Sequence, residues 1–580
     1  MLGERSPQRG LFEADHLYLG FVGEDTFYGF LARQRGGLFH DGDFAEFYSP
    51  DQGRPSVPPS LLATALLLQT HDRVSDEEAK ARADYDLRWK VALGVEVDER
   101  PFAKSTLQLF RAQLVLKEKM RAVFQRSLEY ALQSGYLKKH KLRAVLDTTY
   151  ILGRGAVKDT YNLLADSMRQ LLREVAQEGG SEQVTWAEEH GYGRYMASSI
   201  KGEAEVDWDN EESRGEFLRG IVSDGERLLG LADEALASLA EEEVGRERIQ
   251  RAAELMRQLI SQDVERGEGR VSLKEGVARD RVISVHDPEM RHGRKSSSKR
   301  FDGHKAAIAV DAESQLITAV EVLAGNAADS ERALELTTTS EENTGLEVEE
   351  TIGDCAYGSG NTRQAFADEE RKLVAKVSRH GRRGQIPKEE FRINLEDTTC
   401  TCPAGQTTQT LIKAGRWTDR FGQKHQRWAF LFDADVCEAC NRRPGCVQAK
   451  GCRGRTIQLH PQEQLLQEAR ELQKSDAFKE YSQIRQTAEH RLARLVQLGI
   501  RQARYFGRRK TLFQLLIAAT VANLTLVANK TEQKDSEDSP SLSLSSSILA
   551  FGKSVWSHLT HLELNLTSTG GQKPAFRLGF

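Results

Sequence analysis

Residues 141–161 read KLRAVLDTTYILGRGAVKDTY, and this stretch decides the fold of the chain. Apolar residues from Leu142 to Leu146 run directly into a carboxylate, Asp147, and are followed by two threonines and a tyrosine, which favour β-strands. The pattern predicts a buried strand that carries one acid. A buried carboxylate is costly unless it is neutralised, and a bound cation neutralises it well, so a second acid in a similar setting is expected.

Two further acids meet this expectation. Asp354 ends a short predicted strand in ETIGDCAYGSGNTRQAF, which starts at Glu350, and Glu489 lies on a strongly helical segment. Three acids alone are a weak signal because acids are common, and Asp159, Asp302 and Asp311 are rival candidates. The local sequence around Asp147, Asp354 and Glu489, and the order in which these contexts occur, is more specific.

Five motifs carry a resemblance to a known family. They are DTTYILGRGAVKDTYNLL (147–164), GHKAAIAVD (303–311), GNAADS (325–330), DCAYGS (354–359) and the run from Arg485 to Glu489. They resemble bacterial insertion-sequence transposases that have a ribonuclease H-like catalytic core and an Asp, Asp, Glu triad. The resemblance runs from about residue 40 to about residue 530.

The resemblance implies a DNA transposase that cleaves at transposon ends and transfers a 3′ hydroxyl to target DNA. Asp147, Asp354 and Glu489 would then hold two Mg²⁺ ions, or Mn²⁺, with Asp147 as the bridging ligand, because carboxylate oxygens suit such hard cations. Two alternatives remain open. One is a ribonuclease H-like nuclease without strand transfer, and the other is a non-catalytic DNA-binding derivative, against which the intact triad argues.

The chain carries 81 basic and 86 acidic residues, a net charge of −5, so contacts with DNA must come from local basic patches. One patch lies within residues 291–305 and a second within residues 501–510. On the segment that carries Glu489, the family signature Tyr, Arg, Glu, Lys is matched by Arg485 and Glu489. Tyr481 is one residue further from Arg485 than usual, and Val496 stands where a lysine is expected. The predicted DNA-binding residues are Arg294, Lys295, Lys299, Arg300, Lys305, Tyr481, Arg485, Arg504, Arg508 and Arg509.

The implied partners are double-stranded DNA, as transposon ends and as target, and a second copy of the chain in a homodimer on DNA. The implied location is cytoplasmic and associated with the bacterial nucleoid. The N-terminal stretch MLGERSPQRGLF is too polar for a secretion signal. Residues 512–528 are apolar but short, and they include Gln514, Asn523 and Thr525, so a buried core helix is predicted there and no membrane span.

The predicted fold class is α/β, with a ribonuclease H-like mixed sheet formed by residues 141–160, 281–380 and 462–530. An N-terminal helical, DNA-end-binding domain (1–140), a helical insertion (161–280), a cysteine-rich insertion (381–461) and a disordered tail (531–580) complete the organisation. Residues 1–50 are predicted to be rich in loops. Helices are expected from Ser60, after a capping box of Ser75 with Glu78, and after a second capping box of Ser105 with Gln108.

Six of the seven cysteines cluster between residues 400 and 452. Cys402, Cys437, Cys440 and Cys446 could form a tetrahedral zinc site, since Cys437-Glu-Ala-Cys440 has the spacing of a zinc knuckle. The alternatives are reduced cysteines in a small core, or the relic of a lost metal site. Cys355 is expected to be a buried core residue.

Overall fold

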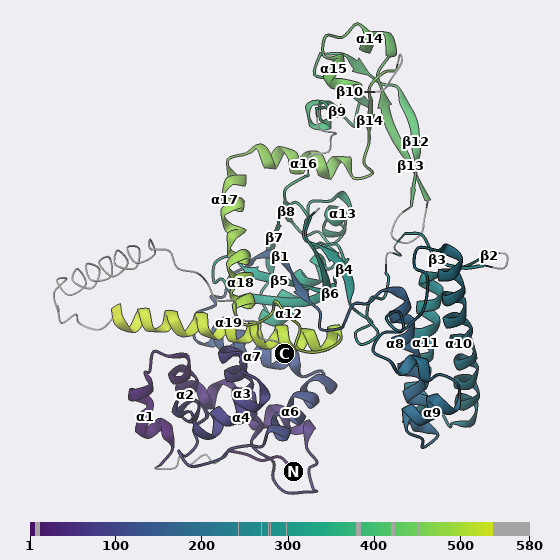
Figure 1. The fold of residues 1–580 in the computed structure, drawn as a ribbon. Helices are drawn as coiled ribbons and strands as arrows, with labels where there is room; N and C mark the ends of the chain where they lie inside the picture. Colours follow the sequence, from purple (N-terminus) through teal and green to yellow (C-terminus); the bar gives the residue numbers. More distant parts are fainter. Residues whose placement is uncertain are drawn as a thin grey trace, which may run out of the picture. The chain divides into compact units, whose positions relative to one another are not determined.

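The computed structural model describes residues 1–5, 12–241, 243–267, 270–276, 278, 280–296, 298–378, 384–418, 424–448 and 453–537 (Figure 1). Residues Met1–Ala528 form one compact unit, and Asn529–Phe580 form a second. The predicted disordered tail lies outside the described residues from residue 538 onward.

A mixed six-stranded sheet lies at the centre of the first unit. Its strands are β1 (Leu142–Leu152), β4 (Arg291–Arg294), β5 (Arg300–Asp311), β6 (Ile317–Ala324), β7 (Val348–Gly353) and β8 (Leu373–Ala375). The order is β4-β5-β1-β7-β8, and β6 pairs with the part of β5 that follows the β4 contact. β5 runs antiparallel to β1, whereas β7 and β8 run parallel to it. This α/β arrangement is consistent with the predicted ribonuclease H-like core.

The strands alternate between two apolar clusters because successive side chains point to opposite faces. On one face Leu146, Ala307 and Ala309 pack with residues of α12 (Ala333–Thr344) and α13 (Gly360–Asp368). On the other face Val145 and Ile308 join a large core that includes residues of α18 (Gln486–Gln497), α19 (Arg508–Glu537) and the N-terminal helices. The sheet is therefore buried on both faces, which explains the continuous apolar run before Asp147.

Helix α19 supplies much of that core. Among the described residues, one helix, Arg508–Asn529, is long and apolar enough to cross a membrane, and 83% of its most apolar stretch is buried inside the protein. The helix packs as the predicted core helix. The structure also explains the polar Asn523, which is fully buried: its side-chain oxygen accepts from the Ile317 N–H (2.9 Å) and its amide donates to the Ile317 carbonyl (2.8 Å), so it satisfies the backbone at the start of β6.

The N-terminal region is helical. Its elements are α1 (Ala14–Val22), α2 (Phe27–Leu38), the 3₁₀ helix η1 (Asp41–Phe47), α3 (Pro59–Asp72), α4 (Asp76–Tyr85), α5 (Leu87–Leu93), α6 (Lys104–Leu116) and α7 (Met120–Gln133). The prediction that residues 1–50 are rich in loops was wrong. Phe27, Phe30 and Leu31 bury one face of α2, a helical spacing that the surrounding glycines obscure in the sequence.

The predicted caps have mixed outcomes. Ser75 accepts from the Glu78 N–H and caps α4, as expected. The cap at Ser105 was wrong, because α6 already begins at Lys104, after Ala103. The long helix expected beyond Ser105 is divided between α6 and α7, where Glu118 takes a positive φ of 58°.

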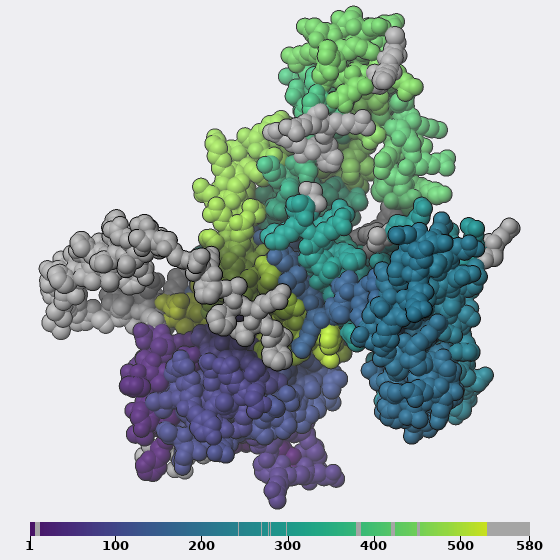
Figure 2. Space-filling view, viewed as in Figure 1, coloured from purple at the N-terminus to yellow at the C-terminus, as the bar shows by residue number. Residues whose placement is uncertain are grey.

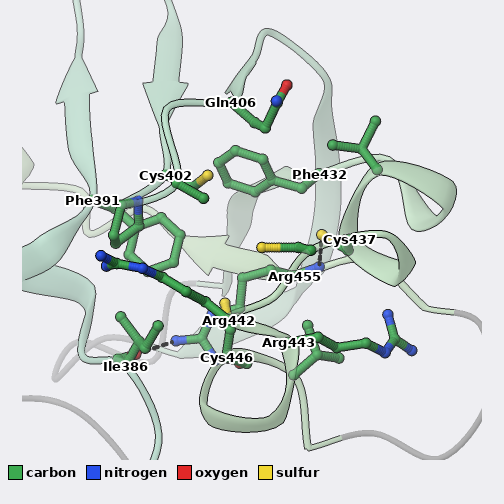
Figure 3. Close-up of a pocket in the computed structure, with 15 residues that line it drawn as sticks. Ile386, Phe391, Cys402, Gln406, Phe432, Cys437, Arg442, Arg443, Cys446 and Arg455 are labelled. Atoms are coloured by element: carbon green, nitrogen blue, oxygen red, sulfur yellow. Dashed lines mark hydrogen bonds between the residues drawn. The ribbon is translucent and has the colours of Figure 1, made fainter.

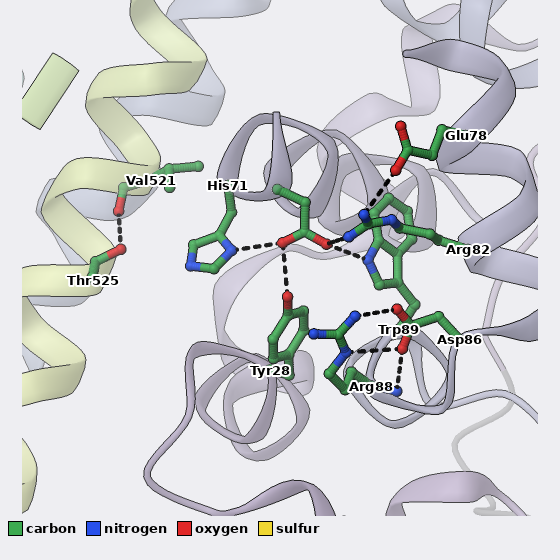
Figure 4. Close-up of polar contacts among 10 residues, drawn as sticks. Tyr28, His71, Glu78, Arg82, Asp86, Arg88, Trp89, Val521 and Thr525 are labelled. Atoms are coloured by element: carbon green, nitrogen blue, oxygen red, sulfur yellow. Dashed lines mark hydrogen bonds and ion pairs between the residues drawn. The ribbon is translucent and has the colours of Figure 1, made fainter. Parts of the chain in front are cut away.

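A buried carboxylate, Asp72, joins α2, α3, α4 and α5 (Figure 4). It accepts hydrogen bonds from Tyr28 and His71 on one oxygen, and from Arg82 and Trp89 on the other. Burial raises the pKa of Asp72, but these four hydrogen bonds outweigh it and hold the pKa well below its usual value. Asp72 is therefore ionised at neutral pH and fastens four helices together.

The chain between β1 and β4 has its own apolar core. Its elements are α8 (Thr160–Glu178), α9 (Gln183–Glu189), η2 (Gly193–Met196), α10 (Glu211–Ser238), α11 (Val244–Asp263), β2 (Val264–Gly267) and β3 (Arg270–Leu273). The helical character is as expected. The sequence analysis missed the β2–β3 hairpin that follows α11.

The cysteine-rich region contains short strands and helices. They are η3 (Lys388–Glu390), β9 (Arg392–Asn394), β10 (Thr399–Thr401), β11 (Thr407–Thr408), β12 (Leu411–Thr418), β13 (Lys424–Leu431), α14 (Ala434–Glu438), α15 (Arg443–Cys446) and β14 (Thr456–Gln458). Helices α16 (Glu463–Lys474) and α17 (Ala477–Ile484) lead on to α18.

We predict that Asn523→Ala lowers the free energy of unfolding by about 2–4 kcal/mol, because it leaves two buried backbone groups of Ile317 unpaired. The matched control is Thr525→Val on the same helix. The Thr525 hydroxyl donates a hydrogen bond to the Val521 carbonyl one turn earlier (Figure 4), so its removal should cost less than about 1 kcal/mol. Urea unfolding curves measure both. Equal effects of the two substitutions would show that Asn523 does not hold β6.

Candidate active site

The pairing of β1 with β7 brings two of the predicted acids together. Val145 lies opposite Ile352 in this parallel pair, so Asp147, in the middle of β1, and Asp354, directly after β7, lie next to each other, each two residues further on. Asp147 accepts from the Thr148 N–H, and Asp354 accepts from the Ala356 N–H at 2.8 Å. Parallel strands are about 4.8 Å apart, so the two carboxylates lie beside each other at the carboxyl end of β7.

Helix α18 brings the third acid. Ala488, Leu492 and Leu495 bury one face of this helix against the core, and Glu489 lies on the adjoining, exposed face. Arg485 forms an ion pair with Glu489 (2.7 Å). Arg485 therefore lies one helical turn before Glu489, as the sequence predicted.

The electrostatics of Asp147 show that these groups act on one another. Its pKa is raised to about 6, first by burial and then by the negative charges of Asp354 and Glu489. The Thr148 N–H and the charge of Arg485 lower the pKa but do not offset the rise. Three carboxylates thus face one guanidinium group, and this excess of negative charge, made only of oxygen donors, fits a hard divalent cation.

Among the described residues, the one trio whose possible ligand atoms all lie within 4.8 Å of one another is elsewhere, at Glu13, Asp15 and His16. Arg35 pairs with both of those carboxylates, at 3.0 Å and 3.1 Å. Both carboxylates of that cluster therefore already share an arginine partner.

The rival acids have structural roles. Asp159 caps α8 by accepting from the Tyr161 and Asn162 N–H groups. Asp311 is buried and accepts from the backbone and hydroxyl of Ser314. Asp302 pairs with His292 at 2.6 Å.

Two residues beside the acids were missed, although both lie in motifs quoted above. Tyr357 is fully buried, its ring packs on Gly353, and no described group hydrogen-bonds its hydroxyl. Burial, and then the charges of Asp147, Asp329 and Asp354, raise its pKa well above the usual value. Asp329 is held by Lys305 at 2.7 Å. The signal available in the sequence was a tyrosine four residues after the glycine that precedes Asp354.

Several predicted basic residues gather around Tyr150, three residues after Asp147. Lys295 and Lys299 lie over its ring, at 5.6 Å and 5.5 Å from the centroid, and Arg501 lies at 3.8 Å. The segment that carries these lysines is part of the β4–β5 hairpin. Arg294 and Arg300 are exposed on this hairpin and line a cavity of about 490 Å³.

Other predicted DNA-binding residues make contacts within the protein. Lys305 donates to Asp329 and to the Ala327 carbonyl, and the Tyr481 hydroxyl donates to the buried Glu350 at 3.0 Å. The remaining three bind residues of other segments: Arg504 contacts the Val74 carbonyl, Arg508 pairs with Glu289, and Arg509 contacts the Val115 and Leu116 carbonyls and pairs with Glu118. These five residues contact other parts of the protein. The sequence alone does not distinguish such contacts from contacts with phosphate.

The four cysteines predicted to bind zinc line one small cavity of about 30 Å³ (Figure 3). Cys402 follows β10, Cys437 and Cys440 belong to α14 and the turn after it, and Cys446 ends α15. The Arg455 N–H donates to the Cys437 sulfur at 3.5 Å, and its guanidinium group donates to the Cys446 carbonyl. Arg442 and Arg443 also line the cavity.

Two other cysteines differ from this set. Cys400 is fully buried in the core of the cysteine-rich region, and burial raises the pKa of its thiol to about 12, so it stays protonated. Cys355 was predicted to be a buried core residue, which is wrong: it is exposed in the turn after Asp354, because β7 ends one residue before that acid.

We predict that Asp147→Asn stabilises the metal-free protein at pH 8 by at most about 3 kcal/mol, because the folded state raises the pKa of Asp147 from 3.8 to about 6. For an acid whose folded pKa is raised, the penalty is absent below about pH 4, grows as the unfolded chain ionises, and is complete above about pH 6. The gain should therefore vanish near pH 4. Urea unfolding with a chelator at both values measures it, with exposed Glu203→Gln as control. A gain that is equal at both pH values contradicts the assigned cause.

Comparisons with known proteins give two matches. A family model described as "Transposase DDE domain" matches residues 401–528, and a model described as "Transposase domain (DUF772)" matches residues 30–113. No curated protein and no solved structure matches the chain. The first match includes Glu489, α18 and the apolar part of α19, and the second includes α3 to α5 and most of α2 and α6. DDE transposases act on DNA and generally use divalent metal ions. The two matches support an insertion-sequence DDE transposase.

Proposed function

We propose that this transposase cleaves DNA at the ends of its element and joins the resulting 3′ hydroxyl to target DNA. The observation that carries the proposal is the convergence of Asp147, Asp354 and Glu489 at the carboxyl end of β7, where the charges of Asp354 and Glu489 raise the pKa of Asp147. Three acids from separate parts of the chain are not needed there for folding, and together they destabilise the metal-free site.

The three carboxylates would hold two divalent metal ions, Mg²⁺ or Mn²⁺. When bound, such ions polarise the phosphodiester and lower the pKa of the attacking water or hydroxyl. Arg485, whose partner here is Glu489, lies where it could exchange that carboxylate for a phosphate of the substrate. Tyr357 offers a buried hydroxyl that could orient Asp147.

Lys295, Lys299 and Arg501 would hold the DNA beside these acids. All three surround Tyr150, which is about 10 Å along β1 from Asp147 at the usual rise per residue. Arg294 and Arg300 continue the basic surface along the β4–β5 hairpin. The distance matches the length of a few nucleotide steps, so these residues could grip the phosphates that flank the cleaved bond.

The expected partners are double-stranded element ends, target DNA and a second copy of the chain in a homodimer. We place the activity in the bacterial cytoplasm, at the nucleoid. A nuclease of the same fold without strand transfer would release cut ends but form no joined product. A non-catalytic derivative would bind ends without cutting them.

We predict that Asp147→Asn, Asp354→Asn and Glu489→Gln each abolish cleavage while end binding stays nearly unchanged, since each removes one charged ligand and little volume. The matched control is Asp302→Asn, because Asp302 pairs with His292 outside the triad. The measurement is a gel of cut and joined products from the element's own ends with Mg²⁺. Near-normal cleavage by any of the three variants would show that its acid is misassigned, and cutting without joining would favour the nuclease.

We also propose that Cys402, Cys437, Cys440 and Cys446 hold a structural zinc ion. The cavity of about 30 Å³ that they line has room for an ion but not for an organic cofactor. Four thiolates around zinc leave a net negative charge, which Arg442, Arg443 and Arg455 at the same cavity could balance.

We predict about one zinc per chain in protein purified without chelator, if the four thiols form one tetrahedral site. Cys437→Ser should lose the metal, whereas Cys400→Ser should keep it, because Cys400 faces the apolar core instead. Elemental analysis of the three proteins decides. Zinc that is absent from the folded wild-type chain, or lost from both variants alike, would remove this assignment.

A further inference from the structure

The β12–β13 hairpin extends beyond the small sheet that anchors it. β14 pairs only with Ala429, Phe430 and Leu431 at the base of β13, so the outer part of the hairpin is a two-stranded ribbon (Figure 1). None of its described residues before Ala429 is buried, and in the view of Figure 2 its side chains lie at the surface. A two-stranded ribbon without a core is marginally stable, so this one is expected to have a function outside its own domain.

The charged residues of this ribbon are mostly positive. Residues 411–431 contain five lysines and arginines and one acid, in a chain whose net charge is −5. The cations described in the structure are Lys413, Arg416, Lys424 and Arg427, and all four are exposed. Within the described part of the chain, none of the four forms an ion pair with a carboxylate. This contrasts with Lys305 and Arg508, whose charges are paired inside the protein.

The register gathers three of these cations on one face. Residues directly opposite in an antiparallel pair share a face, and Lys413 lies opposite Trp428, Arg416 opposite Gln426, and Thr418 opposite Lys424. We call the six side chains of these three pairs the cationic face. It contains no acid, and Trp428 is 42% exposed on it, next to Lys413. The opposite face carries the stacked rings of Trp417 and His425, at 4.7 Å.

One simpler explanation is that the charges only protect open strand edges from pairing with other chains. Such protection works with charges of either sign and is not improved by an exposed tryptophan. The cationic face combines three cations, and no acid, with an aromatic ring and an amide. This composition is suited to binding a polyanion. The length also fits: strands of eight residues extend about 26 Å, and a two-stranded ribbon fits the major groove of DNA, which is about 12 Å wide.

We propose that the cationic face of the β12–β13 hairpin binds the phosphate backbone of double-stranded DNA, as an arm separate from the acid triad. This inference rests on the proposed function in that the duplex would be the element end or the target. Lys413, Arg416 and Lys424 contact phosphates, and the Trp428 ring packs on the adjoining sugars. These contacts position the duplex and carry no sequence preference, since phosphates are the same in every sequence.

The test measures binding of the full chain to labelled DNA by fluorescence anisotropy over a salt series. The probes are a duplex of the element's own end, a duplex of unrelated sequence and a single strand of that sequence. The variant Lys413→Ala/Arg416→Ala/Lys424→Ala should weaken binding to both duplexes about tenfold or more at moderate salt, and should flatten the salt dependence by about 0.9 for each lost contact. Trp428→Ala alone should weaken both duplexes several-fold, and Trp428→Phe should weaken them less.

The matched control is Arg173→Ala/Arg251→Ala/Arg257→Ala, which changes the net charge equally at exposed arginines that pair with Glu174, Glu247 and Asp233. An effect of the control equal to that of the hairpin variant would overturn the proposal, because the loss would then come from net charge. A loss confined to the single strand would also overturn it, in favour of a single-strand site. Circular dichroism and thermal unfolding of each variant show that the fold is kept.

The outcomes distinguish this inference from the proposed function. If wild-type protein neither cuts nor joins the element's ends but the hairpin variant still loses duplex affinity, the arm stands and the reaction does not. If wild-type protein cuts and joins and the hairpin variant binds both duplexes normally, the reaction stands and the arm does not.

Discussion

The parallel pairing of β1 with β7 is the interaction on which the candidate site depends. It is the seam where the antiparallel half of the sheet, β6-β5-β1, meets the parallel half, β1-β7-β8. Asp147 and Asp354 lie side by side where this pairing ends, and a shift of one residue in the register would turn their side chains to opposite faces. The buried residues before each acid, apolar before Asp147 and mixed before Asp354, hold the register. The core thereby forces two like charges into proximity.

The remaining parts of the core hold that seam in place. α18 and α19 cover one face of the sheet, and Asn523 of α19 satisfies the start of β6, while the N-terminal helices join the same apolar cluster. Several cations that the sequence suggests for DNA connect these parts: Arg504 reaches the Val74 carbonyl, and Arg509 reaches the end of α6. Asp72 has the corresponding role among the N-terminal helices. Some of the charged residues of the chain thus hold its own segments together.

Helices and strands with a strong local sequence pattern were predictable from the sequence. β1, the short strand before Asp354 and the start of α3 follow from apolar runs and turn residues, and Glu489 follows from its helical context. The helices before residue 50 were missed because glycines interrupt their spacing. The break at Glu118 was missed because it depends on a positive φ that the sequence does not display. The pairing of Tyr481 with Glu350, and of Lys305 with Asp329, depends on contacts between distant segments, so local sequence carries no signal for it.

A protein with a net charge of −5 binds a polyanion only where cations outnumber acids locally and are free of internal partners. By that criterion the described structure separates two groups. Lys305, Arg508 and Arg509 are paired with Asp329, Glu289 and Glu118. Lys295 and Lys299 cluster at an aromatic ring beside the acids, and Lys413, Arg416 and Lys424 lie on an open ribbon. Duplex DNA carries condensed counterions on its phosphates, and a free lysine or arginine that binds a phosphate releases some of them, which favours binding. Lys305, Arg508 and Arg509 gain less from the same exchange, because each would first have to give up its carboxylate. Outside the acid site, we therefore propose the surfaces that hold DNA from cations without an internal carboxylate partner, and not from the number of basic residues in a segment.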